Sequence, residues 1–309
     1  MEYHEPVLLE ESIRALAIKP DGVYLDGTLG GGGHFEELVH NLSDKGTAVG
    51  IDRDPQAIDR CRARFGDAVP NVIIMQSRFS DFDVVLEKNG LSAIDGVILD
   101  LGVSSHQIDS CERGFSHATE CALDMRMNPG DDESAAELLG RIDESELSDI
   151  LAGYGEVANA PRMARALLSG SSRPRTSAEL KELLEKEYGR VMQPKVLSRI
   201  FQALRIAVNG ELSELERFLG KIERFLNADG RLVVISYHSL EDRMVKQFMA
   251  QAEKECVCPP RQPVCTCSKR PSMRRVGKKA VQPSLAEVQG NRRARSARMR
   301  VAERVQQCS

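Results

Sequence analysis

Acidic side chains and a run of glycines are the residues of this sequence that could do chemistry together. Asp26 precedes Gly30–Gly33 in "DGTLGGGGHF", Asp52 lies in "GIDRD", and Asp100 ends "DGVILD". Glycine lets a backbone pass very close to a bound molecule, and carboxylates accept hydrogen bonds from sugar hydroxyls and amines. These residue types predict a site that holds a nucleotide-like ligand.

The segments on either side of the glycines support this prediction. "GVYLD", residues 22–26, is short and apolar and indicates a buried strand, whereas "HFEELVHNL", residues 34–42, has its apolar side chains at helical spacing. A strand, a glycine turn and a helix form the layout of a nucleotide-binding loop. The alternative is a flexible linker, which is not expected between two buried elements.

Strand patterns of the same kind recur along the chain. We predict strands at 22–26, 47–52, 71–76, 94–100 and 230–236. Helical patterns separate the first four, which predicts an α/β fold with a parallel sheet and helices on both faces. Ligands of such sheets bind at the carboxyl ends of the strands, where the strand order reverses. The candidate carboxylates end three of these strands.

The alternation stops between Asp100 and Gly230, where no convincing strand pattern occurs. We predict a helical unit inserted between the fourth and fifth strands. Its helices are expected at 134–140, 144–153, 159–169, 177–188, 194–208 and 211–226.

The composition of the 309 residues, with 41% apolar and 28% charged, is that of a soluble globular protein. No stretch is long enough to span a bilayer, and the first residues lack the pattern of a signal peptide. We therefore expect a cytoplasmic enzyme.

The last part of the chain is basic. Residues 254–309 hold fourteen Lys and Arg against three Glu, a balance of +11 in a chain whose net charge is −4. A polyanionic partner is one explanation, and a solvated, poorly ordered tail is the other. Residues 297–305 alternate apolar and basic side chains, which is typical of a half-buried strand.

The eight cysteines are expected to be thiols or metal ligands rather than disulfides, because cytosolic proteins rarely keep disulfides. "CVCPPRQPVCTC" pairs two C-x-C units, Cys256 with Cys258 and Cys265 with Cys267. Four thiolates could bind zinc tetrahedrally, but the usual two-residue spacing within each pair is absent. A proline-bent loop with reduced cysteines is the alternative, and we assign no metal a role in catalysis.

Several nucleotide ligands compete for the glycine loop. The dinucleotide fingerprint needs a third glycine, but Phe35 follows Gly30 and Gly32 instead, which argues against an NAD-dependent oxidoreductase. The spacing from Asp26 to Gly32 matches the pattern typical of S-adenosylmethionine-dependent methyltransferases. Asp52 would then accept hydrogen bonds from the ribose, and Phe79 could cover the adenine or simply belong to the core. A non-catalytic RNA-binding module remains a further alternative.

A set of motifs resembles the bacterial ribosomal RNA small subunit methyltransferase H family, also called MraW. The motifs are "HEPVLLEE" (4–11), "DGTLGGGGH" (26–34), "IDRDPQAI" (51–58), "DGVILDLGVSSHQID" (95–109), "RGFS" (113–116), "LDMRM" (123–127), "FQALRIAVN" (201–209), "SYHSLEDRMVK" (236–246) and "RARSARMRVAE" (293–303). They cover nearly the whole chain.

The resemblance implies a Rossmann-like class I methyltransferase sheet interrupted by a helical domain. Its expected divisions are 1–110 and 209–309 for the methyltransferase domain and 111–208 for an inserted substrate-recognition domain. The implied reaction is methylation of the N4 amine of one cytidine in the decoding region of 16S ribosomal RNA. S-adenosylmethionine is the implied cofactor and the small ribosomal subunit the implied partner; neither DNA nor a membrane is expected.

The resemblance also assigns residues. The implied cofactor contacts are Gly32, Gly33, His34, Asp52, Phe79, Asp100 and Gln107. Asp100 is the candidate catalytic acceptor for the cytosine amine, although it could instead bind the cofactor. Candidates for contact with the RNA are Arg126, Ser236, His238, Arg293 and Arg295, and for His238 a structural hydrogen-bonding role is the alternative. The sequence departs from the family pattern at Val157–Ala160 and at Arg292, which puts details of RNA contact in doubt.

Overall fold

The chain divides into two compact units. The computed structural model describes residues 6–66, 71–117, 120–170, 172–189, 191–258, 262, 264, 266–267 and 269–306. One unit is formed by residues 1–102 and 213–309, and the other by residues 103–212. Within the described ranges, none of the helices is long and apolar enough to cross a membrane.

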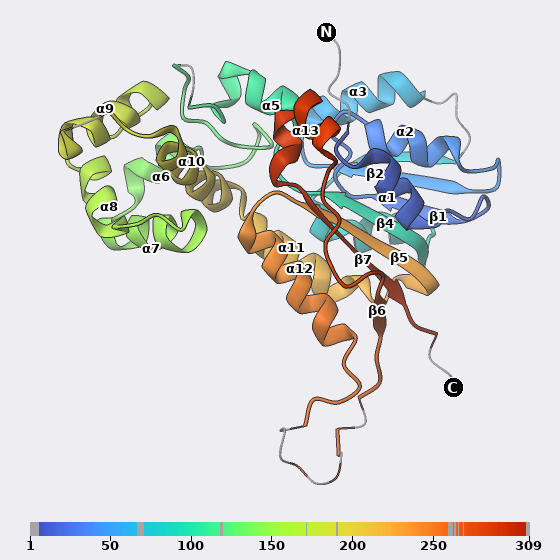
Figure 1. Ribbon diagram of the computed structural model, residues 1–309. Helices are drawn as coiled ribbons and strands as arrows, with labels where there is room; N and C mark the ends of the chain where they lie inside the picture. Colours follow the sequence, from blue (N-terminus) through green and yellow to red (C-terminus); the bar gives the residue numbers. More distant parts are fainter. Residues whose placement is uncertain are drawn as a thin grey trace. The chain divides into compact units, whose positions relative to one another are not determined.

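A seven-stranded sheet organises the first unit (Figure 1). Its strands are β1 (Val23–Asp26), β2 (Thr47–Asp52), β3 (Val72–Gln76), β4 (Ile94–Asp100), β5 (Leu226–Ser236), β6 (Met273–Arg275) and β7 (Arg298–Arg304). Their order is β3-β2-β1-β4-β5-β7-β6. Strands β1 to β5 pair in parallel, as the sequence predicts, whereas β7 is antiparallel to both β5 and β6. The sheet is therefore mixed, because the last strand inserts between two strands that run the other way.

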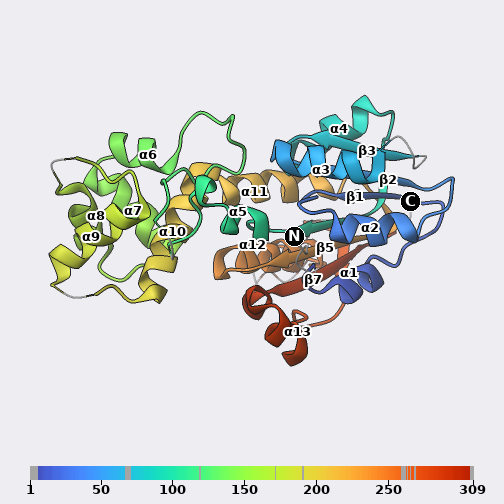
Figure 2. The same ribbon diagram turned by 90° about the horizontal axis from the view of Figure 1, so that it is seen from above.

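Helices cover both faces of this sheet, which explains why its strands are apolar at nearly every position. One face packs on α1 (Leu9–Leu16), α2 (Gly33–His40) and α3 (Pro55–Phe65). The other face packs on α4 (Phe82–Lys88), α11 (Glu211–Ile222) and α12 (Ser239–Ala252). The two core clusters divide these helices between the faces, and the helices can be followed in Figure 2. The short elements η2 (Phe79–Asp81), α13 (Leu285–Gly290) and η4 (Arg292–Ser296) complete the unit.

The strand order reverses between β1 and β4. From β1 the chain continues to β2 and β3 on one side, and β4 then starts on the other side of β1. Such a reversal leaves a crevice at the carboxyl ends of the two strands, where ligands of open α/β sheets bind. The fold is the Rossmann-like α/β sheet that the sequence predicts.

The second unit is helical. It contains α5 (Ser105–Asp109), η3 (Cys111–Arg113), α6 (Ala135–Arg141), α7 (Glu144–Gly155), α8 (Ala160–Leu168), α9 (Ser177–Tyr188) and α10 (Pro194–Asn209). In this unit α7 packs against both α10 and α8, and α8 also packs against α9. The helices predicted up to residue 208 are confirmed to within a few residues. The helix expected at 211–226 ends at Ile222 as α11 and packs on the sheet of the first unit, so its assignment to the helical unit is wrong. Ser134, Asp143 and Thr176 begin α6, α7 and α9 with capping boxes, which fixes where each helix starts.

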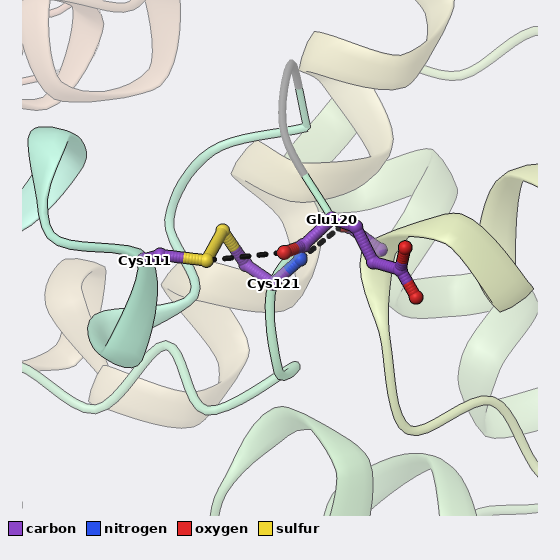
Figure 3. Close-up of a disulfide and its surroundings, with 4 residues drawn as sticks. Cys111, Glu120 and Cys121 are labelled. Atoms are coloured by element: carbon purple, nitrogen blue, oxygen red, sulfur yellow. Dashed lines mark hydrogen bonds between the residues drawn. A yellow bond between two sulfur atoms is a disulfide. The ribbon is translucent and has the colours of Figure 1, made fainter.

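A disulfide joins Cys111 to Cys121 in the helical unit (Figure 3). The Cα atoms lie 5.1 Å apart, within the usual range for a disulfide, and the Cys111 sulfur is 3.1 Å from the Glu120 carbonyl oxygen. The prediction that the cysteines are thiols or metal ligands is wrong for this pair. The prediction used only the expected compartment, whereas the structure places Cys121 beside Cys111.

Asn209, at the end of α10, ties this helix to the loop that contains the "LDMRM" motif. Its amide donates to the Met125 carbonyl at 2.7 Å and accepts from the Met127 N–H at 2.8 Å, and the side chain is buried. We expect Asn209→Ala to lower the free energy of unfolding by about 2–3 kcal/mol, because two buried backbone groups lose their partners. Urea unfolding followed by circular dichroism measures this change, since the chain has no Trp.

Asn41→Ala is the matched control. Asn41 is exposed and its amide donates to the Glu37 carbonyl on the same helix, so a change of about 0.5 kcal/mol or less is expected. Equal effects of the two substitutions would contradict the role given to Asn209.

Candidate functional site

Asp52 holds the glycine loop against the end of β2. The Gly30 N–H donates to Asp52 Oδ2 at 2.7 Å, and the Asp54 N–H donates to Asp52 Oδ1 at 2.8 Å. The neighbouring Leu29 N–H donates to the Ile51 carbonyl at 3.0 Å. Burial raises the pKa of Asp52 to about 6, although the two N–H donors oppose the shift. Each Asp52 oxygen keeps a lone pair for a further donor.

The glycines of the loop are required for different reasons. Gly32 has φ +80°, and a Cβ there would lie 3.0 Å from Cys61 Sγ. A Cβ on Gly33 would lie 2.5 Å from Pro6 Cγ. Both therefore allow close packing within the protein. At Gly30, φ is +50° and the nearest heavy atom to an added Cβ is 3.8 Å away. The open side of the loop is at Gly30, the residue that Asp52 binds.

Thr28 links the ends of β1 and β4 where the strand order reverses. The Asp100 N–H donates to Thr28 Oγ1 at 2.6 Å, and the Thr28 N–H donates to Asp26 Oδ1 at 3.0 Å. Burial raises the pKa of Asp26 to about 7, and it also raises the pKa of Asp100 to about 7. The negative charges of Asp100 and Asp52 add to the upward shift at Asp26, so the three carboxylates act on one another.

Tyr237 and His34 approach Asp100 from two other elements. The Tyr237 hydroxyl donates to Asp100 Oδ1 at 2.8 Å, and His34 Nδ1 lies 3.8 Å from Asp100 Oδ2. His34 Nε2 is 3.1 Å from the Val7 carbonyl. A carbonyl only accepts, so the proton of the neutral ring is assigned to Nε2. Burial lowers the pKa of His34, which favours this neutral form. His34 therefore presents the Nδ1 lone pair towards Asp100.

Phe79 follows β3 and lies beside the glycine loop. A Cβ on Gly27 would come within 3.3 Å of the Phe79 Cβ, and the Phe79 ring meets the Phe218 ring edge-on at 5.8 Å between centroids. The ring is only half-buried. It packs on the core through one edge and leaves surface for a ligand, so both roles considered from the sequence are compatible with its position.

Ser236 and His238 each make a hydrogen bond that stabilises the fold of the first unit. Ser236 Oγ donates to the Arg298 carbonyl on β7 at 3.2 Å. His238 caps α12, where its Nδ1 accepts from the Glu241 N–H at 3.4 Å. The side chain between them, Tyr237, is the one that reaches Asp100. Sequence reasoning missed it, although the alternation of side chains along a strand could have indicated that Tyr237 points away from Ser236.

Two predicted site residues belong to the helical unit. Gln107 completes a capping box with Ser104, whose N–H donates to Gln107 Oε1 at 2.9 Å. The Arg126 guanidinium forms a two-pronged ion pair with Asp124, at 2.9 and 2.7 Å, and also donates to the Asp131 carbonyl. These contacts order the loops in which the two residues lie.

The basic residues expected at the C-terminal end lie on or beside η4. Arg295 is exposed and Arg293 is half-buried. Asn291 caps this turn by accepting from the Arg293 N–H at 3.0 Å. The following strand β7 confirms the strand predicted at 297–305, so this part of the basic segment is ordered.

Three of the four cysteines considered for zinc lie together: Cys256, Cys258 and Cys267. Cys265 lies outside the described residues.

The residues at the reversal point fit S-adenosylmethionine, the cofactor expected from the sequence. No described side chain caps the N-terminus of α2 at Gly32, and the start of a helix favours an anionic carboxylate. Asp52 can accept from ribose hydroxyls. The group formed by Asp26, Asp52 and Asp100 is negative when ionised, which suits a sulfonium cation.

The buried carboxylates predict how stability depends on pH. The folded pKa of Asp26 is about 7 against 3.8 for the unfolded chain, so the folded state binds more protons between these values and stability falls as pH rises through this range. We expect Asp26→Asn to raise stability at pH 8 and to reduce its decline between pH 5 and 8. The urea midpoint measured across this range tests the expectation.

Asp95→Asn is the control, because the pKa of Asp95 is shifted in the opposite direction to that of Asp26. Burial raises its pKa, but hydrogen bonds from the Val23 N–H and from Lys19 outweigh burial, and the net pKa is lowered. Asp95 therefore stabilises the fold above its unfolded pKa, and its replacement should lower stability at pH 8. Identical pH profiles for the Asp26→Asn variant and the unsubstituted protein would contradict the prediction.

Comparison with known proteins agrees with the resemblance. The profile of the MraW methylase family matches residues 1–305. Ribosomal RNA small subunit methyltransferase H of Clostridium botulinum is 43% identical over 99% of this chain and 100% of its own length. The proteins of the same name from Dehalococcoides mccartyi and Caldicellulosiruptor bescii are 44% and 43% identical over 98% of this chain, and over 86% and 99% of their own lengths. The chain belongs to the MraW methylase family.

Proposed function

We propose that this protein transfers a methyl group from S-adenosyl-L-methionine to the exocyclic N4 amine of one cytidine in the decoding region of 16S ribosomal RNA. The methyltransferase class follows from family membership, and the names of the relatives support ribosomal RNA of the small subunit as the substrate. A cytoplasmic location is proposed on the same ground. The choice of the cytosine amine rests on the resemblance and on the chemistry below.

One observation carries the proposal: Asp52, Asp100 and the glycine loop meet at the reversal point of the sheet. In the proposed complex Asp52 binds the ribose hydroxyls, and Gly32, Gly33 and His34 place the start of α2 beside the amino-acid part of the cofactor. Phe79 covers the adenine. Gln107 stays a proposed cofactor contact on the ground of the resemblance alone.

The cofactor supplies an electrophilic methyl group on a sulfonium. The cytosine amine is a poor nucleophile, because its lone pair is delocalised into the ring. Asp100 in its carboxylate form accepts a hydrogen bond from the amine N–H and orients the nitrogen. Tyr237 fixes one Asp100 oxygen at 2.8 Å, which leaves the other for this task. With a pKa of about 7, Asp100 is half ionised at pH 7, and its carboxylate form predominates above that pH.

The RNA is proposed to contact the ordered basic segment and the helical domain. Arg293 and Arg295 offer planar donor groups suited to phosphate. Residues 111–208 are the proposed substrate-recognition domain, with 1–110 and 209–309 as the catalytic domain. Arg126, Ser236 and His238 stay proposed contacts for the RNA, and their described hydrogen bonds order the segments that carry them. The target base must leave its stack to reach Asp100.

Loss of the Asp52 carboxylate should weaken cofactor binding. We expect Asp52→Ala to raise the Kd for S-adenosylmethionine by about 10- to 100-fold, because hydrogen bonds to a charged group contribute about 1.5–3 kcal/mol. Isothermal titration calorimetry measures this effect directly.

Asp59→Ala provides the matched control, since Asp59 is an exposed carboxylate on the neighbouring helix α3. The Kd of the Asp59→Ala variant for S-adenosylmethionine should stay within twofold of that of the unsubstituted protein. An unchanged Kd in Asp52→Ala would rule out the proposed ribose contact.

The reaction itself is tested with small subunits from a strain that lacks the corresponding gene. Incubation with the protein and isotopically labelled S-adenosylmethionine should place the label on one cytidine of the decoding region, detected by mass spectrometry of RNase fragments and of nucleosides as N4-methylcytidine. Naked 16S RNA is compared in parallel.

Asp100→Asn should reduce the rate by at least about 100-fold while cofactor binding changes less. The absence of any labelled RNA with the unsubstituted protein would favour the non-catalytic RNA-binding alternative. Label on a base other than cytosine would reject the proposed N4 specificity but retain the methyltransferase.

A further inference from the structure

The connection between α12 and β6 brings three sulfurs together, and nothing in the proposed methyl transfer uses them. Cys256 and Cys258 follow α12, and Cys267 precedes β6. The sulfur atoms of the three residues all lie within 4.8 Å of one another, and those of Cys256 and Cys267 are 3.8 Å apart. These residues lie outside the hydrophobic clusters of the unit, so apolar packing does not account for their convergence.

The separation of the sulfurs matches the geometry of a metal site. Zinc binds thiolates at about 2.3 Å in a tetrahedron, whose edges are then about 3.8 Å long. Cys256 and Cys267 already stand at this distance. Calcium and magnesium prefer oxygen ligands, whereas sulfur ligands select zinc among the abundant divalent cations.

Backbone N–H groups point at each of the three sulfurs. The Val257 N–H donates to Cys267 Sγ, the Cys258 N–H to Cys256 Sγ and the Thr266 N–H to Cys258 Sγ, each at 3.4 Å. These donors fix the positions of the three sulfurs relative to the backbone. They also orient the ligands, as the second shell of a metal site does.

We propose that Cys256, Cys258 and Cys267 bind a zinc ion that fastens the two ends of the connection between α12 and β6. One further ligand completes the tetrahedron. The ion has a structural role: it shapes a surface connection whose flanks carry the exposed basic residues Lys254 and Arg270. It takes no part in methyl transfer.

Metal analysis of the full-length protein tests the proposal. After zinc loading and removal of excess metal by gel filtration, mass spectrometry of the metal should find about one zinc ion per chain. The zinc content of a variant with Cys256→Ser, Cys258→Ser and Cys267→Ser should fall to the background level. Val264→Ser, an exposed substitution in the same connection, should keep the full zinc content.

Two further measurements do not depend on the folding of the triple variant. Cobalt added to the unsubstituted protein should give thiolate-to-cobalt charge-transfer absorption, and zinc should abolish it by displacement. A strong chelator should increase tryptic cleavage after Lys254 and Lys269, and zinc should reverse this effect.

Zinc at background level in the unsubstituted protein, or equal zinc in the unsubstituted and triple-variant proteins, would overturn the proposal. A disulfide between Cys256 and Cys267 in protein purified anaerobically would do so as well. Because zinc binding is measured without RNA or S-adenosylmethionine, its failure leaves the proposed methyl transfer untouched.

Discussion

The hydrogen bond from the Gly30 N–H to the Asp52 carboxylate is the contact on which the candidate site depends. It joins the loop after β1 to the end of β2, and Asp52 holds its own chain by a second bond from the Asp54 N–H. The acceptor proposed for the ribose is thus also the group that shapes the loop. A ligand at Asp52 and the conformation of the loop are coupled through one side chain, whose lone pairs serve both.

Negative charge is concentrated where the sheet reverses direction, and the protein restrains it in several ways. The Thr28 N–H donates to Asp26, and the Tyr237 hydroxyl donates to Asp100. Burial makes ionisation of these carboxyls costly in the protein alone. A cation bound nearby would favour the ionised forms, so a sulfonium ligand and this group of acids stabilise one another.

Much of the fold could be predicted from the sequence because local patterns determine it. Apolar runs located β1 to β5, and capping residues such as Thr176 located the helices. The direction of β7 could not be predicted, since alternation identifies a strand but not its partner. Tyr237 was missed because its hydrogen bond to Asp100 depends on how close the end of β5 lies to the end of β4. The glycine run indicated a close approach, but only the packing of Pro6 and Cys61 shows that Gly33 and Gly32 approach protein atoms.

The position of β7 has a consequence for how the protein is made. β7 comes last of the strands in the chain, yet it lies between β5 and β6, so β6 has no neighbour in the sheet until the ribosome has synthesised residue 304. Until then β5 has an open edge whose backbone groups can pair with another chain. A nascent protein of this design is therefore exposed to misassembly from the synthesis of β5 onwards, and its final seven-residue strand ends that period.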